Sequence, residues 1–325
     1  MSIDEDVLFD EPQALMAHEA EGTPGESHDR GIEQVVRWFR SHTDLEGRFS
    51  SVLRQALDEV LDGQRTGRYD VNDLEKTEKT YLGTKVEIVC RAAFDLPVGK
   101  EMDYRIGTQE VDAKFSLEGT RRANWMIPRE AMGHLCLLMS ANDRESTFRV
   151  GLVRISEDIL TRGGNQDGKR SISTFGRRHI KWLFEKGKLK SNLLLGLDQA
   201  TRTALEQVPV GQNRVDQLFR HVHGRIIDRN TVVTVAKQLD APKRVRDARR
   251  RLASEGVVIL GHQKDSPQVA RALDLPIPDK GTWIATRLVP APPVGDGRPR
   301  VWIGDTAYVT ARPDEARCPA PVIDY

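Results

Sequence analysis

Four residues in the first half of the chain could support hydrolytic chemistry: Glu87, Asp103, Asp112 and Lys114. Asp112 and Lys114 are two positions apart in a predicted strand, and this spacing puts both side chains on one face. A hairpin that turns at residues 107–108 would bring Asp103 from the partner strand close to that face. Glu87 is predicted on the strand before. Carboxylates held together repel one another unless a cation lies between them, so this set predicts a cation site.

Hard oxygen ligands of this kind suit Mg²⁺. A lysine beside the metal could orient or deprotonate an attacking water, or stabilise charge on a phosphate, which is the minimum needed for metal-assisted phosphodiester hydrolysis. The spacing has the form of the PD-(D/E)xK nuclease motif, with Met102 in place of the proline. A surface Asp–Lys pair on an edge strand is the alternative interpretation, because a D-x-K sequence is common by chance.

The elements that must position these residues are predicted from hydrophobic periodicity. Apolar residues at helical spacing predict two helices, and a turn at Gly83 separates a short polar helix from a β-rich run. A buried strand or short helix and an alternating strand follow the hairpin. Strands flanked by helices favour an α/β or α+β domain. The ranges are 31–40 and 47–62 for the helices, 85–90 for the β-rich run, 132–142 for the buried element and 147–156 for the alternating strand.

The charge of the chain is nearly balanced but unevenly distributed. The 325 residues include 49 Lys+Arg and 48 Asp+Glu. Residues 1–26 contain acidic side chains and no Lys or Arg, so we predict a flexible acidic leader. Basic residues gather in 169–190 and 237–251, and although either cluster alone could be a solvated face, two together favour a polyanion such as double-stranded DNA. The expected DNA contacts in the first cluster are Arg177, Arg178 and Lys181.

The second basic cluster lies in a pattern of three helices and a following strand within residues 213–260. Asn230 or Thr231 is expected to cap the second helix, and Pro242 to begin the third. An apolar stripe with basic residues around it is typical of a recognition helix in a winged helix-turn-helix domain. The same pattern occurs in transcription regulators with a sensor domain, which is the alternative function. The expected DNA contacts of the third helix are Lys243, Arg244, Arg246, Arg249 and Arg250.

Several classes of protein are excluded by the composition. The three cysteines are far apart and form no C-x-x-C pair, so neither a zinc ribbon nor a disulfide framework is expected. The sequence contains no apolar run long enough to span a membrane, and its first residues do not have the pattern of a signal peptide. We therefore expect a cytoplasmic protein.

The run at residues 73–89, the spacing of Asp103, Asp112 and Lys114, and the basic C-terminal half together resemble the NaeI-type type IIE restriction endonucleases. The resemblance implies a PD-(D/E)xK endonuclease domain, at 27–185, and a winged helix-turn-helix domain similar to that of catabolite activator protein, at 193–325. The polar composition of residues 186–192 predicts a linker between them. It also implies a homodimer that binds two copies of DNA, one as substrate and one as allosteric effector.

By the same resemblance Glu87, Asp103, Asp112 and Lys114 match the catalytic set, with Mg²⁺ as cofactor. The hypothesis is that Asp103, Asp112 and the Ala113 carbonyl hold Mg²⁺, that Glu87 completes the shell of this or a second metal, and that Lys114 positions the water. The products would be 5′-phosphate and 3′-hydroxyl ends.

Overall fold

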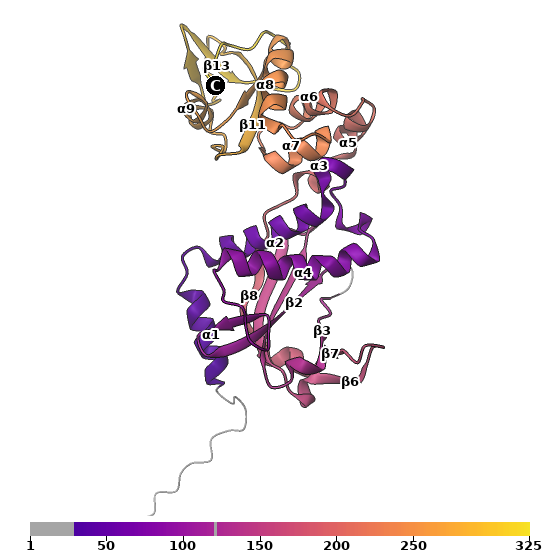
Figure 1. Ribbon diagram of the computed structural model, residues 1–325. Helices are drawn as coiled ribbons and strands as arrows, with labels where there is room; N and C mark the ends of the chain where they lie inside the picture. Colours follow the sequence, from indigo (N-terminus) through magenta and orange to yellow (C-terminus); the bar gives the residue numbers. More distant parts are fainter. Residues whose placement is uncertain (1–28, 120–121) are drawn as a thin grey trace, which may run out of the picture.

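The computed structural model describes residues 29–119 and 122–325, so the predicted leader at 1–26 lies outside the described residues. The described chain forms two parts, one above the other in Figure 1. The first is a mixed sheet with helices on one face, and the second combines short helices with a smaller sheet. Both are mixed α/β architectures, as the pattern of strands flanked by helices predicts for the first part.

The first part is organised around a five-stranded sheet whose order is β1-β2-β4-β5-β8. β2 and β4 are parallel, while the other neighbours are antiparallel. The predicted hairpin around residues 107–108 and the strands on either side of residue 145 are confirmed. The strands are β1 (Tyr104–Ile106), β2 (Gln109–Leu117), β4 (Leu135–Asn142), β5 (Thr147–Arg154) and β8 (Lys181–Lys188).

β4 is buried on both faces and so separates two hydrophobic clusters. Leu135, Leu137 and Met139 belong to the cluster beneath the helices. Cys136 and Leu138, which point the other way because side chains alternate along a strand, belong to the cluster on the opposite face. This explains why the sequence could be interpreted as either a strand or a short helix, since a strand buried on both sides shows no polar alternation.

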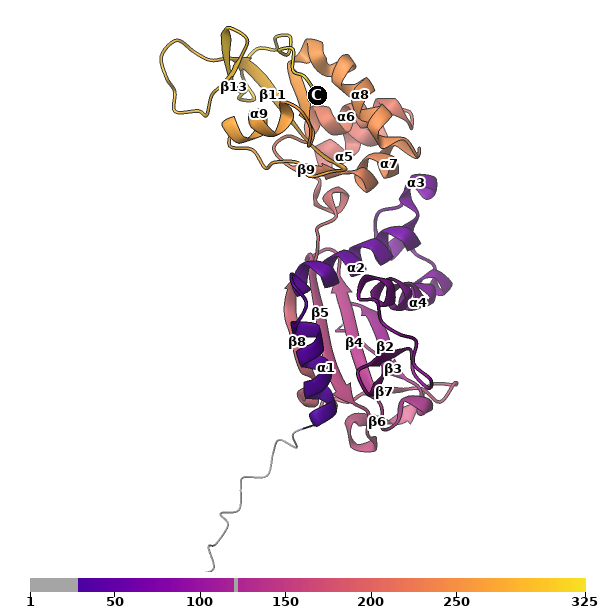
Figure 2. The same ribbon diagram turned by 60° about the vertical axis from the view of Figure 1, so that its left-hand side comes forward.

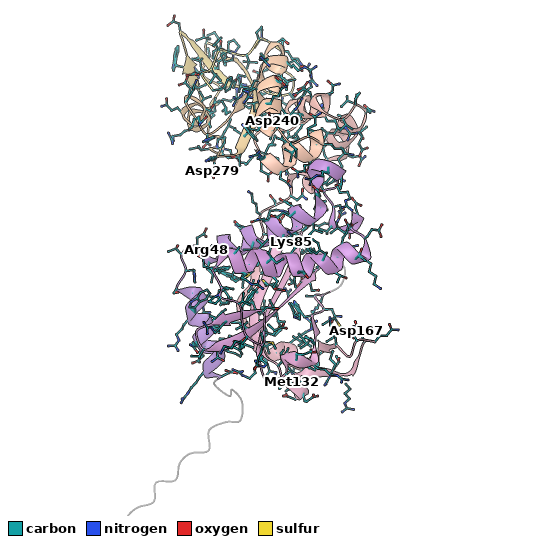
Figure 3. All side chains as sticks on the ribbon, viewed as in Figure 1. Arg48, Lys85, Met132, Asp167, Asp240 and Asp279 are labelled. Carbon is teal, nitrogen blue, oxygen red and sulfur yellow. The ribbon has the colours of Figure 1, made fainter. Side chains whose placement is uncertain are left out.

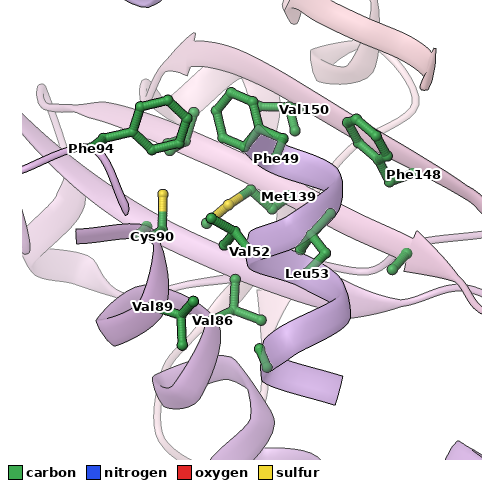
Figure 4. Packing of buried hydrophobic residues seen from close by; sticks show 14 of the residues in the cluster. Phe49, Val52, Leu53, Val86, Val89, Cys90, Phe94, Met139, Phe148 and Val150 are labelled. Carbon is green, nitrogen blue, oxygen red and sulfur yellow. The ribbon is translucent and has the colours of Figure 1, made fainter. Parts of the chain in front are cut away.

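Helices cover one face of this sheet, as Figure 2 shows from the side. Their apolar residues interlock with Met139, Phe148 and Val150 of the strands (Figure 4). These helices are α1 (Arg30–Arg40), α2 (Leu45–Leu61) and α4 (Lys76–Ala93), while the short α3 (Gly63–Thr66) lies away from the sheet, towards the second part.

The predicted turn at Gly83 and strand at 85–90 are wrong, because both lie inside α4. Leu82, Val86 and Val89 are buried at helical spacing and pack towards α2. The β-branched residues of this run have strand propensity, but burial of the apolar stripe against the core stabilises the helix more. A side chain at Gly83 would meet nothing within 4 Å, so this glycine occupies a partly exposed helix position rather than a turn.

A three-stranded sheet, ordered β3-β7-β6, closes the other side of the first part. Its strands are β3 (Met126–Ile127), β6 (Leu160–Gly164) and β7 (Arg170–Ile172). Short 3-10 helices connect the elements along the chain. They are η1 (Val71–Asp73), η2 (Arg129–Ala131), η3 (Glu157–Ile159), η4 (Gly176–His179), η5 (Leu193–Gly196) and η6 (Ala253–Glu255).

The predicted linker at 186–192 is partly wrong, because β8 continues to Lys188 and Leu189 is buried in the cluster beneath the helices. The polar composition of this segment reflects an edge strand whose outer side is exposed. Tertiary hydrogen bonds therefore extend the sheet by three residues beyond the boundary that composition predicts.

The second part begins with helices and ends with a sheet in the order β10-β11-β13-β12, with β9 also paired to β11. The three expected helices correspond to α6, α7 and α8, and the expected strand after them is β10. The elements are α5 (Gln199–Glu206), α6 (Gln212–His221), β9 (Ile226–Asp228), α7 (Arg229–Ala236), α8 (Ala241–Leu252), β10 (Val257–Leu260), α9 (Ser266–Ala272), β11 (Thr282–Pro290), β12 (Val301–Ile303) and β13 (Thr306–Thr310).

Aspartates cap the two helices at the centre of this part. Asp228, rather than the predicted Asn230 or Thr231, caps α7, because the helix begins two residues earlier than expected. Asp240 (Figure 3) caps α8 by accepting from the amide of Lys243, and a proline lies in the first turn. Each cap satisfies an amide that the helix itself leaves free.

The two parts meet where α3 packs against α7. Gly63 permits this approach, since a Cβ there would lie 2.2 Å from Thr234 Oγ1. Asn192 Nδ2 also donates to the Tyr69 carbonyl at 2.8 Å and so fastens the connecting segment to the first part. No helix in residues 29–119 or 122–325 is long and apolar enough to cross a membrane.

Candidate active site and basic surfaces

The hairpin β1–β2 carries the acidic set with one lysine. Val111 and Ala113 of β2 point into the core beneath the helices, so Asp112 and Lys114 project from the opposite face. The parallel register places Asp112 beside Cys136 of β4. The Cys136 thiol lies 3.6 Å from Asp112 Oδ2, which leaves Oδ1 for other partners.

Lys114 binds the two oxygen atoms that a metal was expected to share. Its Nζ lies 2.6 Å from Asp112 Oδ1 and 3.0 Å from the Ala113 carbonyl oxygen. Asp103, immediately before β1, joins the same group because its Oδ2 accepts from the Ala113 amide at 2.8 Å. The structure therefore brings together Asp103, Asp112, Ala113 and Lys114, as the hairpin predicted.

Glu87 reaches the site from helix α4, not from a strand as predicted. Its carboxylate pairs with Arg91, one turn further along, at 2.6 Å. Tyr104 Oη donates to the Glu87 carbonyl at 2.9 Å, and this contact ties α4 to the start of β1. Arg91 also lies over the Tyr104 ring, 5.8 Å from its centroid. Glu87 is thus held at the margin of the hairpin by its own helical neighbour.

The electrostatics of the site favour an additional cation. Burial raises the pKa of Asp112, Lys114 opposes this shift and Asp103 adds to it. Burial followed by the charge of Asp103 likewise raises the pKa of Glu87. For Lys114, burial disfavours the ammonium but Asp112 outweighs it, so the pKa of Lys114 is raised. Crowded carboxylates with raised pKa values are those whose charge a divalent ion would stabilise.

The donor set fits a divalent cation in part. Asp103, Asp112 and the Ala113 carbonyl supply oxygen atoms in one place, which is the ligand type that Mg²⁺ prefers. Within the described part of the chain, however, no three His, Cys, Asp or Glu side chains are grouped closely enough to hold a metal ion. Glu87 would have to leave Arg91 to become a third ligand.

The basic residues expected at 177–181 do not share one environment. Arg177 is drawn inward: it donates to the Ala123 carbonyl and stacks on Trp125 at 5.2 Å. Burial and neighbouring arginines lower its pKa. Arg178 and Lys181 are exposed and form no ion pair with any described residue. Two of the three residues are therefore available to a polyanion, and Arg177 mainly supports the loop.

The expected outward side chains of α8 also differ from one another. Lys243 and Arg250 are exposed but both pair with Asp247 on the same helix. Arg244 is half-buried against α6, with its Nε buried and unpaired among the described residues. The two remaining members of the set, Arg246 and Arg249, line a common cavity.

Sequence reasoning missed two residues in contact with the site, Cys136 and Arg91. Arg91 follows Glu87 by four positions, which is the spacing of an ion pair on a helix, and the correct helix assignment would have identified it. No local pattern could have identified Cys136, since only the pairing of β2 with β4 places it beside Asp112.

The geometry is that of an acidic hairpin with one lysine in a mixed sheet, joined to a second part rich in arginine. Comparison with known proteins gives the same class. The family model described as "Restriction endonuclease NaeI" matches residues 33–319. The chain is also 42% identical over 305 residues to "Type II restriction enzyme NaeI" of Lentzea aerocolonigenes, a match that covers 91% of this chain and 95% of that protein.

The chain is therefore a type II site-specific deoxyribonuclease by class. It belongs to the NaeI restriction endonuclease family. DNA is accordingly its partner, and the transcription-regulator alternative is not favoured. Type II restriction endonucleases generally use divalent metal ions, which agrees with the oxygen-rich donor set of the hairpin.

Proposed function

We propose that the chain is a Mg²⁺-dependent endonuclease that cleaves both strands of DNA at the hairpin of β1 and β2 and leaves 5′-phosphate and 3′-hydroxyl ends. The observation that carries the proposal is the single group formed by Asp103, Asp112, the Ala113 carbonyl and Lys114. When bound, Mg²⁺ would supply positive charge against the scissile phosphate and lower the pKa of a water.

The residues themselves have separate tasks in this proposal. Asp103 and Asp112 present carboxylate oxygens, and Asp103 also orients the Ala113 peptide through its amide. Lys114 now bridges Asp112 and the Ala113 carbonyl, so it is positioned to hold an attacking water at the same oxygens. Glu87 would be a further ligand of this metal or of a second ion if it were released from Arg91.

The second part is proposed to be a winged helix-turn-helix domain that holds a second copy of DNA as effector. The order α6, α7, α8 followed by β10 and β11 supports this, because a capped basic helix after a tight turn is the pattern of a recognition helix. Lys243, Arg244, Arg246, Arg249 and Arg250 of α8, with Arg177, Arg178 and Lys181 beside the nuclease sheet, would neutralise phosphates of the two copies. A homodimer would supply one active site for each strand of the substrate.

Cleavage of supercoiled plasmid and phage DNA, with and without Mg²⁺, tests the proposal. We expect Mg²⁺-dependent double-strand cuts at fixed sites, and Asp112→Asn should lower the rate at least about 100-fold. Asp167→Asn is the matched control, since Asp167 is an exposed carboxylate in the loop between β6 and β7 (Figure 3).

Wild-type activity in Asp112→Asn, or cleavage that is unaffected by chelator, would refute the metal site. The two-copy model makes a separate prediction: a short duplex containing the site should accelerate cleavage of a single-site plasmid. Equal rates with and without the added duplex would refute the effector role while leaving the nuclease role intact.

A further inference from the structure

A cavity of about 380 Å³ lies between α8, the loop after β10 and the loop before β11. Four basic side chains line it: Arg229 at the start of α7, Arg246 and Arg249 of α8, and Lys280 before β11. No Asp or Glu side chain among the described residues lines this cavity. Because these basic side chains have no acidic partner in the cavity, they repel one another. This repulsion predicts that an anion binds in the cavity.

The cations of this cavity are free to bind a ligand. Arg229, Arg246 and Lys280 are exposed and form no ion pair with any residue in the described ranges. Lys243 and Arg251 of the same helix are by contrast paired, with Asp247 and Asp216 at 2.8 Å each. Two cations of α8 that form no ion pair among the described residues, Arg246 and Arg249, therefore both line the cavity.

Arg249 is fixed in place at the wall of the cavity. Its Nε donates to the Ile259 carbonyl at 2.8 Å, and its guanidinium lies over the Tyr325 ring, 3.9 Å from the centroid. Burial lowers the pKa of Arg249 to about 10, so it remains a cation at neutral pH. These two contacts fix the orientation of the guanidinium. Its remaining N–H groups therefore point in a fixed direction, which suits the binding of a tetrahedral oxyanion.

A buried hydroxyl without a partner marks the same cavity independently. Ser266 is 1% exposed, and its Oγ has no hydrogen-bond partner in the part of the chain that the structure describes. Ser266 also lines the cavity. A buried hydroxyl is costly unless it is hydrogen-bonded, so a ligand oxygen is the group that this position lacks.

We infer that this cavity binds a phosphate group, with Arg246, Arg249, Lys280 and the Ser266 hydroxyl as its donors. The inference rests on the proposed role of the second part in holding DNA, and its favoured source of phosphate is therefore the DNA backbone. Free phosphate has the same chemistry. The site would anchor the duplex beside α8 and set the register in which that helix meets the bases.

Binding of a labelled duplex in the presence of chelator tests the inference without requiring cleavage. Arg246→Gln and Lys280→Gln should each lower the affinity about tenfold and reduce the slope of log K against log salt by about 0.9. Ser266→Ala, which changes no charge, should lower the affinity about fivefold. Arg271→Gln is the matched control, because Arg271 is an exposed, unpaired cation of α9 that does not line the cavity.

A second titration with inorganic phosphate, by calorimetry, distinguishes the two sources. Loss of duplex affinity in the cavity variants assigns the site to the DNA backbone, and loss of phosphate binding alone assigns it to the free anion. The inference is overturned if the cavity variants and Arg271→Gln behave alike in both titrations. Because neither titration depends on metal or cleavage, an inactive nuclease site would leave this result unaffected.

Discussion

Asp58 is a carboxylate in a place that disfavours its charge, and its removal should stabilise the protein. It lies on α2 near the junction of the two parts, and burial raises its pKa from 3.8 to about 6. Arg54 opposes the shift, and the charge of Asp228 at the start of α7 adds to it. Arg54 pairs with Asp58 at 2.7 Å, but it also pairs with the fully buried Asp143 at 2.5 Å, so two carboxylates share its charge and burial still dominates the pKa of Asp58.

The magnitude follows from the shift in pKa. A group whose pKa is higher in the folded protein stabilises it below the unfolded pKa, and this stability is lost as the pH rises through the folded value. For Asp58 the pH range over which this stability is lost runs from 3.8 to about 6. A shift of about two units corresponds to about 3 kcal/mol, so ionised Asp58 costs about that much above pH 6. Asp58→Asn, which resembles the neutral acid, should recover most of it.

Urea unfolding followed by tryptophan fluorescence at a series of pH values measures the effect. We expect Asp58→Asn to match the wild type near pH 4 and to exceed its free energy of unfolding by about 3 kcal/mol near pH 7.5. Glu59→Gln is the control, because the neighbouring Glu59 is 41% exposed and its hydrogen bond to Gln55 lowers its pKa. That variant should not gain stability.

Destabilisation by Asp58→Asn near pH 7.5 would refute the reasoning, since it would mean that attraction to Arg54 outweighs burial. Arg54→Met provides the opposite case. It leaves the carboxylate of Asp143, which is 0% exposed, without its partner, and should cost about 3–5 kcal/mol. If both variants changed stability in the same direction, the division of Arg54 between its two partners would be wrong.

Two further predictions concern packing and capping. Gly187→Ala on β8 would put a Cβ 2.4 Å from the Phe148 ring of β5, so thermal unfolding should show a loss of about 1–3 kcal/mol, and an unchanged midpoint would contradict the packing. Asp228→Ala removes the cap of α7 and should cost about 1 kcal/mol by the same measurement, while Asp228→Asn, which can still cap, should cost much less.

The hairpin and its chemistry were predictable because the information is local. The turn at 107–108 and the two-residue spacing of Asp112 and Lys114 require only a strand with alternating sides. Glu87 was assigned to the wrong kind of element for the opposite reason. Its neighbours have strand propensity, and only packing of the stripe at Leu82, Val86 and Val89 against α2 makes them a helix.

The basic residues show the same limit at the surface. Composition identified the clusters at 169–190 and 237–251, since charge is read directly from the sequence. It could not tell that a backbone carbonyl and an aromatic ring hold each of Arg177 and Arg249 in a fixed position. Which cation is free depends on neighbours contributed by distant segments, and these are known only when the chain is folded.

By itself the sequence determined the mixed α/β class, the acidic hairpin with its lysine, the basic C-terminal helix and the family to which they pointed. Each of these depends on residue type and short-range spacing. The tertiary structure alone decided that Glu87 approaches from α4, that Cys136 lies against Asp112, and that unpaired cations gather around Ser266. The reason is physical: burial decides whether a segment forms a helix or a strand, and contacts between distant segments decide whether a charged side chain is paired or free. Neither is a property of a local segment.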